Sequence, residues 1–408
     1  MKVFSTRSVL LALTVLLASL PGYTQTSGLT PQGGIDPALL TKARLDDPVA
    51  EFELSVIYRK GLGVPKDQIL SASWLRKSAE HGYPNAQYNM GLSYELGQGV
   101  SQDDAKAAEW YTKAAEDGHP GAQRHLGILF ATGRGVPKDE RQAFALFTAA
   151  ANGGEPFAQF ELGRAYDNGH YFKQDKALAA EWYRKAADQG NPGAQYNLAL
   201  MYEHGDGIPK DLSMSAQLYR KAAEQGEAGS QFALGLAYVH GWGVPQDYAQ
   251  GIVWYTKAAG QGNTDAMDNL ALLYAMGQGV PKDEAKAEGW FLKAAEAGAE
   301  DAQFQVAMDY ATGSHTLKQD MQQAAFWFRK AADRGMVMAQ YNLAMIVNGQ
   351  PGELYFWLSL AIPKMQKGDA QTNAIHARML AESKLTPGKK DELDERVKQW
   401  RLQHDGSR

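Results

Sequence analysis

The chain has 408 residues with a formal net charge of −5 at pH 7, and it contains no cysteine. The missing cysteines exclude disulfides, thiolate metal sites and a lipid anchor attached through a cysteine side chain. No basic stripe runs along the chain, which argues against a nucleic-acid partner.

The first residues have the pattern of a secretory leader. Lys2 and Arg7 precede an apolar run from Val9 to Leu20, and a basic start followed by a short apolar stretch is typical of a signal peptide. The run is short for a bilayer span, so no stable membrane insertion is expected after cleavage. We expect residues 1–24 to be removed on export, with an uncleaved anchor as the alternative. Residues 25–35 are predicted to form a flexible tether.

Residues 36–49 look like half of the unit that follows. Asp36 precedes Pro37, a pair that favours the start of a helix because aspartate caps free N–H groups and proline fits the first turn. We expect an N-terminal capping half-repeat here, since a repeat array must cover its exposed end.

From Ala50 the sequence repeats in rows of 36 residues. Nine rows can be written as far as residue 368, and the last one is degenerate. The fifth position of the rows is apolar, the sixth is small, and the ninth is aromatic in eight rows. A fixed period of this length indicates a repeat architecture in which neighbouring units bury each other's faces.

Each row contains two predicted helices separated by a loop rich in glycine and proline. In the fifth row, Ala194, Leu198, Met201 and Tyr202 share one face at helical spacing, and Gly205 ends the helix. The loop GDGIPKD ends in an aspartate that recurs from row to row and is predicted to cap the second helix. Glycine also recurs inside the first helix. Because it costs about 1 kcal/mol there relative to alanine, we expect a neighbouring helix to lie close against it.

The row AQYNLALMYEHGDGIPKDLSMSAQLYRKAAEQG at residues 194–226 resembles a Sel1-like repeat of the bacterial exported type, a relative of the tetratricopeptide repeat. The resemblance extends over residues 50–368. It implies an all-α, right-handed α/α superhelical solenoid that binds other proteins on its concave face. Some relatives with a cysteine pair in each repeat are credited with β-lactamase activity. This chain lacks those cysteines, so that activity is not expected.

The C-terminal end departs from the repeat. The ninth row loses its long loop, and residues 369–408 are predicted to form C-terminal capping helices. Thr386 and Pro387 favour a helix start, and Leu393, Val397 and Trp400 share one face of the last helix. We expect this segment to cover the last repeat. A helix lying on a membrane is the alternative, and the mixed charge of the segment argues against it.

Candidate protein-binding residues come from two places. First helices line the concave face in related repeats, so we expect contacts from the largely aromatic third position of the rows, at Tyr88, Arg124, Phe160, Tyr196, Phe232, Asp268 and Phe304. Arg124 and Asp268 interrupt the aromatic column and are expected to be exposed. The alternative is the loop edge, where the unusual residues are His170, Tyr171, Phe172 and Trp242. Packing between repeats would also explain the aromatic column, and drift in a tolerant loop would explain the loop residues.

No catalytic or cofactor motif is present. The sequence has no zinc-protease, serine-hydrolase, P-loop or dinucleotide-binding signature, so we expect no catalytic residue, cofactor or metal site. His204 and His240 share one position in adjacent rows, but a metal site there would need a third ligand. The leading interpretation is a non-catalytic scaffold or regulator, periplasmic or secreted, that binds a protein or peptide. The alternative is a hydrolase acting on cell-wall material.

Overall fold

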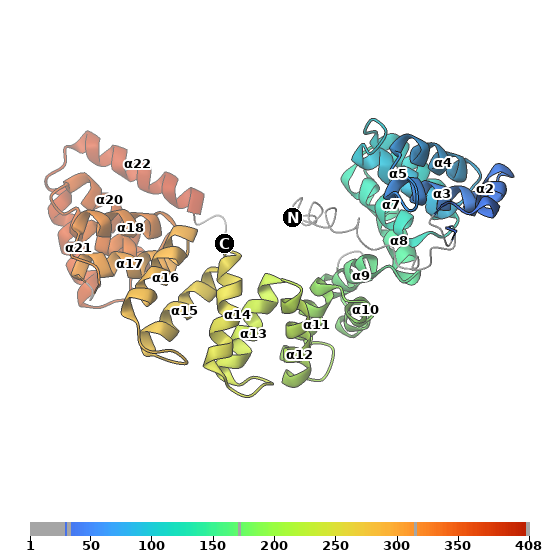
Figure 1. The fold of residues 1–408 in the computed structure, drawn as a ribbon. Helices are drawn as coiled ribbons and strands as arrows, with labels where there is room; N and C mark the ends of the chain where they lie inside the picture. The colour runs from blue at the N-terminus through green and yellow to red at the C-terminus, as the bar shows by residue number, and fades with distance from the viewer. Residues whose placement is uncertain (1–28, 31–33, 170–172, 314–315, 405–408) are drawn as a thin grey trace. The chain divides into compact units, whose positions relative to one another are not determined.

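The computed structural model describes residues 29–30, 34–169, 173–313 and 316–404 of the chain (Figure 1). Within these residues every regular element is a helix, apart from an isolated bridge between Leu29 and Ile35. The predicted all-α fold of paired helices is therefore confirmed. None of the described helices is both long and apolar enough to cross a bilayer.

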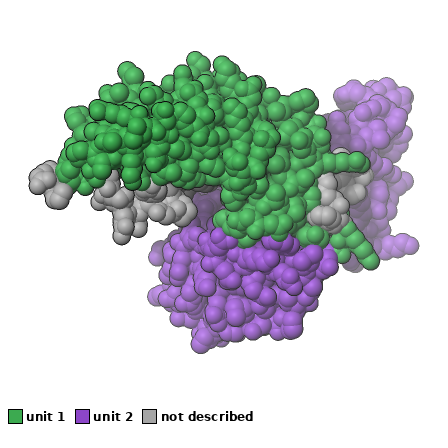
Figure 2. Space-filling model, turned by 90° about the vertical axis from the view of Figure 1, so that its right-hand side faces the viewer, with its two compact units in different colours: residues 1–174 green, residues 175–408 purple. Residues whose placement is uncertain are grey.

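The chain divides into two compact units, residues 1–174 and 175–408 (Figure 2). The helices described in the first unit are α2 (Pro37–Arg44), α3 (Pro48–Lys60), α4 (Gln68–Glu80), α5 (Pro84–Leu96), α6 (Asp104–Glu116), α7 (Pro120–Thr132), α8 (Glu140–Asn152) and α9 (Pro156–Asn168). Those of the second unit are α10 (Lys176–Asp188), α11 (Pro192–His204), α12 (Leu212–Glu224), α13 (Ala228–His240), α14 (Tyr248–Gly260), α15 (Thr264–Met276), α16 (Glu284–Ala297), α17 (Glu300–Thr312), α18 (Met321–Asp333), α19 (Val337–Ile346), α20 (Pro351–Ala361), η1 (Ile362–Lys364), α21 (Asp369–Glu382) and α22 (Pro387–His404). Consecutive helices from α2 to α9 and from α10 to α20 pack on each other, and α22 packs on α20.

In the first eight rows, an aspartate at the end of the loop starts the second helix. In α14, for example, Oδ1 of Asp247 accepts a hydrogen bond from the backbone N–H of Gln250 at 3.0 Å. The predicted caps are confirmed at Asp67, Asp103, Asp139, Asp175, Asp211, Asp247 and Asp283. Asp36 caps α2 in the same way, as predicted. Each carboxylate satisfies N–H groups that the helix leaves unpaired, and so fixes where the helix begins.

Small residues inside the first helices leave room for an aromatic ring of the second helix. A Cβ added at Gly235 in α13 would lie 2.5 Å from a ring carbon of Tyr255 in α14, and one at Gly91 in α5 would overlap the ring of Tyr111 in α6. The predicted close neighbour is therefore confirmed at these glycines. It is the ring from the second helix of the same row.

A glutamine at the second position of the rows joins one row to the next. Nε2 of Gln231 in α13 donates to the carbonyl oxygen of Ala223, near the end of α12, at 3.1 Å. The same bond to the residue eight positions earlier is made by Gln87, Gln123, Gln159, Gln195, Gln303 and Gln340. We call this bond the glutamine clamp. The carbonyl oxygen of Ala223 also accepts from the backbone N–H of Gly226 at 3.0 Å, so the clamp adds a second donor to a carbonyl at the helix end.

The C-terminal helices cover the last helix pair. Leu393 and Val397 of α22 are buried against α20, in which residues 354–361 are all buried. The hydroxyl of Tyr355 in α20 donates to Oδ1 of Asp394 in α22 at 2.7 Å. The apolar face predicted for the last helix therefore packs on the array. We call α20 and α22 together the C-terminal plug.

Candidate protein-binding face

The predicted binding residues occupy the fifth residue of seven first helices, so the repeat places them at equivalent points. They are Tyr88 in α5, Arg124 in α7, Phe160 in α9, Tyr196 in α11, Phe232 in α13, Asp268 in α15 and Phe304 in α17. Their exposure differs. Tyr88 and Arg124 are buried, whereas the other five are partly exposed.

Arg124 is buried, with 5 % of its surface accessible, so the prediction that it is exposed was wrong. Its Nε lies 3.2 Å from Oε1 of Glu155, and its Nη2 lies 2.8 Å from Nε2 of His125. The guanidinium also lies 5.4 Å from the ring centroid of Phe157. The prediction assumed that a charge among aromatic residues must face water. Here an acid, an imidazole and a ring surround the guanidinium, and a planar cation suits such partners.

His125 and Glu95 form the centre of a buried polar network in the first unit. Nδ1 of His125 lies 3.0 Å from Oε2 of Glu95, which also accepts a hydrogen bond from the hydroxyl of Tyr111 at 2.7 Å. Arg134 donates to the other carboxylate oxygen at 3.3 Å. Because the guanidinium of Arg124 can only donate, Nε2 of His125 is an acceptor and Nδ1 carries the proton. The geometry therefore fits a neutral imidazole beside an ionised carboxylate.

The pKa shifts of these two groups agree with that assignment. Burial and the nearby charge of Arg124 lower the pKa of His125 to about 4. Burial opposes ionisation of Glu95, but its bonds with His125 and Tyr111 lower its pKa to about 2. A histidine–carboxylate pair also occurs in catalytic triads. Here each ring nitrogen and each carboxylate oxygen already has a partner within the protein, so the pair is built for structure.

This network was not predicted from the sequence, although the repeat contains a signal for it. A glutamate at the tenth position of the row is followed sixteen residues later by a tyrosine in two rows, and in the second of them the hydroxyl of Tyr219 donates to Glu203 at 2.6 Å. In the row where Val239 replaces the glutamate, the buried hydroxyl of Tyr255 has no hydrogen-bond partner among the described residues. Comparing these two positions across rows would have predicted which tyrosines are paired.

The predicted residues of the second unit are partly buried by their own rows. We call Tyr196, Phe232, Asp268 and Phe304 the second-unit face. Each of its three rings packs against an aromatic ring of the following helix, with centroid separations of 5.9 Å for Tyr196 and Tyr219, 5.7 Å for Phe232 and Tyr255, and 5.6 Å for Phe304 and Phe328. One side of each ring therefore belongs to the core of the row, while part of its surface stays accessible.

Asp268 is the charged member of the second-unit face and is partly exposed. Burial, together with the negative charges of Asp265 and Asp301, raises its pKa to about 6. Its Oδ1 has no hydrogen-bond partner among the described residues. A carboxylate in these surroundings is stabilised when a positive charge approaches. Asp268 is therefore suited to recognise a cationic group.

Of the four candidate residues at the loop edge, the structure describes Trp242. His170, Tyr171 and Phe172 lie outside the described residues. Trp242 is 43 % exposed, and its ring stacks on His240 with centroids 4.6 Å apart. It also borders a cavity of about 30 Å³ that is lined by Glu203 and Tyr219. Trp242 thus remains a candidate contact residue.

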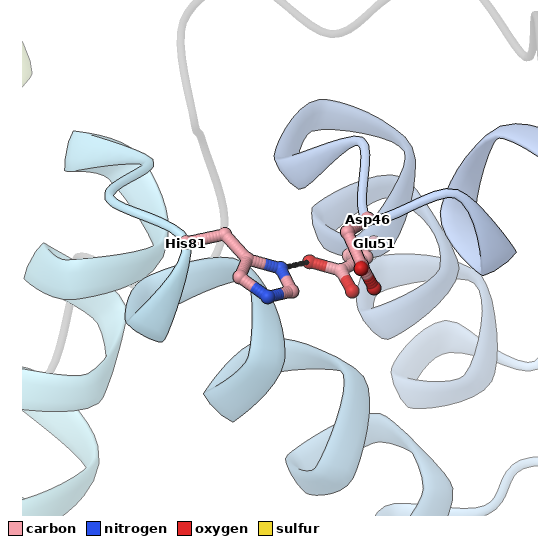
Figure 3. Close-up of side chains that lie close together, drawn as sticks. All are labelled: Asp46, Glu51 and His81. Carbon is pink, nitrogen blue, oxygen red and sulfur yellow. Dashed lines mark hydrogen bonds and ion pairs between the residues drawn. The ribbon is translucent and has the colours of Figure 1, made fainter.

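A cluster of three potential metal ligands lies at the start of the first unit. Asp46, Glu51 and His81 each bring one ligand atom to within 4.8 Å of the others (Figure 3). They come from the loop between α2 and α3, from α3 and from the end of α4. No metal site was predicted from the sequence, where the candidate ligands were histidines that share a position in the repeat. These three residues occupy different positions in their rows, so that criterion does not detect them.

Paired helices that recur along the chain, most of them with the aspartate cap and the glutamine clamp, define an all-α repeat protein. The sequence profile described as Sel1 repeat matches residues 48–83, 84–119, 120–155, 156–191, 192–227, 228–263, 264–298 and 300–336. The chain therefore belongs to the Sel1 repeat family. Repeats of this tetratricopeptide-like class generally act as non-catalytic scaffolds for protein interactions.

Two solved structures are similar over most of the chain. One is c5321, a protective antigen of uropathogenic Escherichia coli strains with an SLR fold; the alignment covers 90% of this chain and 94% of that one, with a TM-score of 0.62 and 29% identity. The other is a Sel1 repeat protein from Oxalobacter formigenes, with 74% of this chain and 88% of that one covered, a TM-score of 0.52 and 33% identity. No curated protein matches the sequence at a significant level.

Proposed function

We propose that this protein is exported to the periplasm or beyond and binds another protein or a peptide without catalysing a reaction. Membership of the Sel1 repeat family supports the binding role. The basic and apolar pattern of residues 1–24 supports export. The binding site that we propose is the second-unit face.

One observation carries this choice of site: the second-unit face presents partly exposed rings and an unsatisfied carboxylate at equivalent points of successive first helices. Aromatic side chains supply contact area with little loss of conformational entropy. Asp268, whose pKa is raised to about 6 by burial and by neighbouring acids, adds a site for a positive charge. The partner that fits is a segment with apolar side chains and a lysine, an arginine or a free amino terminus.

The equivalent positions of the first unit fit a binding role less well. Tyr88 is buried and stacks on His119 with ring centroids 4.6 Å apart. Arg124 is already paired with Glu155 and His125. A partner protein would have to replace these contacts before it gained new ones. We therefore place the main contacts on the second unit.

The test is affinity capture from an envelope extract with the exported form of the chain, followed by titration of the captured partner. The double variant Tyr196→Ala/Asp268→Asn should bind at least about 30-fold more weakly, because truncating one interface anchor commonly costs about 2 kcal/mol. The matched control is Trp242→Ala, which removes an exposed ring at the loop edge. If the control loses the partner while the double variant retains it, binding lies at the loop edge and the proposed site is wrong.

The pH dependence of binding tests the role of Asp268 separately. A cationic partner binds the ionised carboxylate, so affinity should fall as the pH drops below about 6, the pKa of Asp268 in the free protein. Asp265 and Asp301 contribute to that pKa and remain in the Asp268→Asn variant, which should lose the effect. An affinity that is independent of pH between 5 and 7 in the parent protein would contradict recognition of a cation by Asp268.

Export is tested by the mass of the protein recovered from cell fractions. We expect the envelope or medium to contain a chain that lacks residues 1–24. An intact chain that starts at Met1 in the membrane fraction would instead favour an anchor.

A further inference from the structure

Three residues near the start of the first unit lie close together and differ from residues that other rows use at the same positions. The first is Asp46, which lies two residues before α3. The equivalent positions hold glycines with φ between 80° and 100°, namely Gly82, Gly118, Gly154, Gly190, Gly226, Gly262, Gly298 and Gly335. Asp46 has a φ of 61° and is the one non-glycine residue with positive φ among those described. An aspartate adopts this conformation less readily than glycine does.

The second departure is Glu51, which replaces the glutamine of the clamp. An ionised carboxylate has no hydrogen to donate, so Glu51 cannot bond a carbonyl of the preceding helix as the glutamines do. The residue is 0 % exposed, and its Oε1 is buried with no hydrogen-bond partner among the described residues. A buried carboxylate oxygen without a donor is costly unless a positive charge lies beside it.

The third departure is His81, which ends α4. The residue at this position varies from row to row; where it is Gln225 or Gln261, it donates to the amide oxygen of Gln195 or Gln231, in both cases at 2.8 Å. In the first row an imidazole takes the place of the amide, and its Nδ1 lies 2.8 Å from Oε2 of Glu51 (Figure 3). Two neutral amides have thus been replaced by an imidazole and a carboxylate, both of which bind metal ions.

We propose that Asp46, Glu51 and His81 bind one zinc ion. Their ligand atoms lie within 4.8 Å of one another and comprise two carboxylate oxygens and one imidazole nitrogen, a set that suits zinc and leaves one position for water. The distance of 2.8 Å between Nδ1 and Oε2 is shorter than the roughly 3.3 Å that separates two ligands on tetrahedral zinc. The ion would therefore replace this hydrogen bond, and the imidazole would bind in its neutral form.

Zinc at this position would join three segments of the N-terminal end. The loop after α2, helix α3 and the end of α4 each supply one ligand. The capping helix α2 would then be fixed to the first row by a metal ion in addition to its apolar contacts. This role involves none of the residues proposed to bind a protein partner. A negative result for one proposal therefore leaves the other unaffected.

The test uses the untagged chain, first treated with a chelator and then titrated with ZnCl2 in a calorimeter. We expect one zinc ion per chain and a melting temperature that rises with zinc, because a ligand that binds only the folded state stabilises it. The variants Asp46→Gly, Glu51→Gln and His81→Gln each install the residue that the repeat uses at other rows, so each should fold. Each should weaken zinc binding about tenfold or more.

The matched control is His240→Gln, which removes an exposed histidine outside the cluster and should bind zinc as the parent does. A crystal of the parent soaked in ZnCl2 should show an anomalous peak between the three side chains, a result that does not depend on how any variant folds. Absence of saturable binding to the parent would overturn the proposal. Equal affinity in the parent and the three variants, or a peak located elsewhere, would also overturn it.

Discussion

Tyr111 and Tyr255 occupy the same position in two second helices, but their hydroxyl groups differ in surroundings. The Tyr111 hydroxyl donates to Glu95 at 2.7 Å, whereas the Tyr255 hydroxyl is buried with no partner among the described residues. We predict that Tyr111→Phe lowers the free energy of unfolding by about 1.5–3 kcal/mol, the usual value of a hydrogen bond to a charged group. Tyr255→Phe should leave it unchanged or raise it. Urea unfolding followed by circular dichroism measures both, and equal losses would contradict the assignment.

Acid should destabilise the first unit, and His125 and Glu95 have the largest pKa shifts that contribute to this effect. The pKa of His125 is lowered from 6.5 to about 4, and that of Glu95 from 4.5 to about 2. In each case the unfolded chain binds the proton more readily, so the free energy of unfolding falls as the pH drops. The loss through His125 should occur between about pH 6.5 and 4, and the loss through Glu95 between about pH 4.5 and 2.

A comparison of variants separates the pH dependence of stability caused by His125 from that caused by His81. The hydrogen bond with Glu51 raises the pKa of His81, so its contribution is present at low pH and is lost as the pH rises through the folded-state pKa. The measurement is therefore the difference in melting temperature between the parent and His125→Gln from pH 7 to pH 4. The parent should lose more stability than the variant over this range, and parallel curves would refute the prediction.

At the scale of single residues, the sequence predicted side chains whose partners are local. The capping role of Asp247 depends on a backbone N–H three residues away. The residue type and its position before a helix were therefore enough to predict that role. The partner of Glu95 lies thirty residues away in His125. Without the packing of α5 against α7, no local rule joins them. The same reason explains why Arg124, which looked like a surface residue, proved to be buried.

At the scale of helices, two glycines should respond in opposite ways to a larger side chain. Gly289 lies in the exposed part of α16, with nothing within 4 Å of an added Cβ. Gly289→Ala should raise the free energy of unfolding by about 0.5–1 kcal/mol, because alanine favours the helix. Gly91→Leu should lower it by about 1–3 kcal/mol or more, because the new side chain would overlap Tyr111. Thermal melts measure both, and stabilisation by Gly91→Leu would contradict the close packing.

The ends of helices could be predicted because their chemistry repeats. Gly205 ends α11 with φ 80°, and glycines in the same left-handed conformation end α3, α5, α7, α9, α13 and α15. The clamp could not be predicted in this way. A glutamine that recurs at one position of the rows could form a hydrogen bond with several nearby groups. Only the packed structure shows that Gln231 donates to the carbonyl oxygen of Ala223.

At the scale of the whole molecule, the C-terminal plug should stabilise the end of the array and prevent self-association there. Leu393 and Leu402 both lie on α22, but Leu393 is 3% exposed and Leu402 65%. Leu393→Glu should detach α22, lower the melting temperature and cause self-association, because the apolar surface of α20 would be uncovered. Leu402→Glu, the matched control, should remain monodisperse and melt as the parent does. Size-exclusion chromatography with light scattering distinguishes these outcomes, and identical behaviour of the two variants would argue against the plug.

The sequence also predicted the class of the whole fold, because a repeated pattern specifies repeated packing. It did not predict that the chain separates into two compact units between residues 174 and 175. That boundary falls in the loop GHYFKQD, one of the loops that depart from the usual pattern. A period read from a sequence gives the repeating element of packing, but not the position at which the chain divides into two compact units.

The glutamine clamp has a consequence for how a gene of this kind can change length. Gln303 and Gln340 are 37 positions apart, yet each bonds the residue eight positions earlier. The additional residue lies in the loop after Gly313, outside the clamped segment. Codons can therefore be gained or lost in the loops between clamps, and whole rows can be duplicated or deleted. A single insertion between a clamp donor and its acceptor would break the bond, so natural length variation should be confined to the loops.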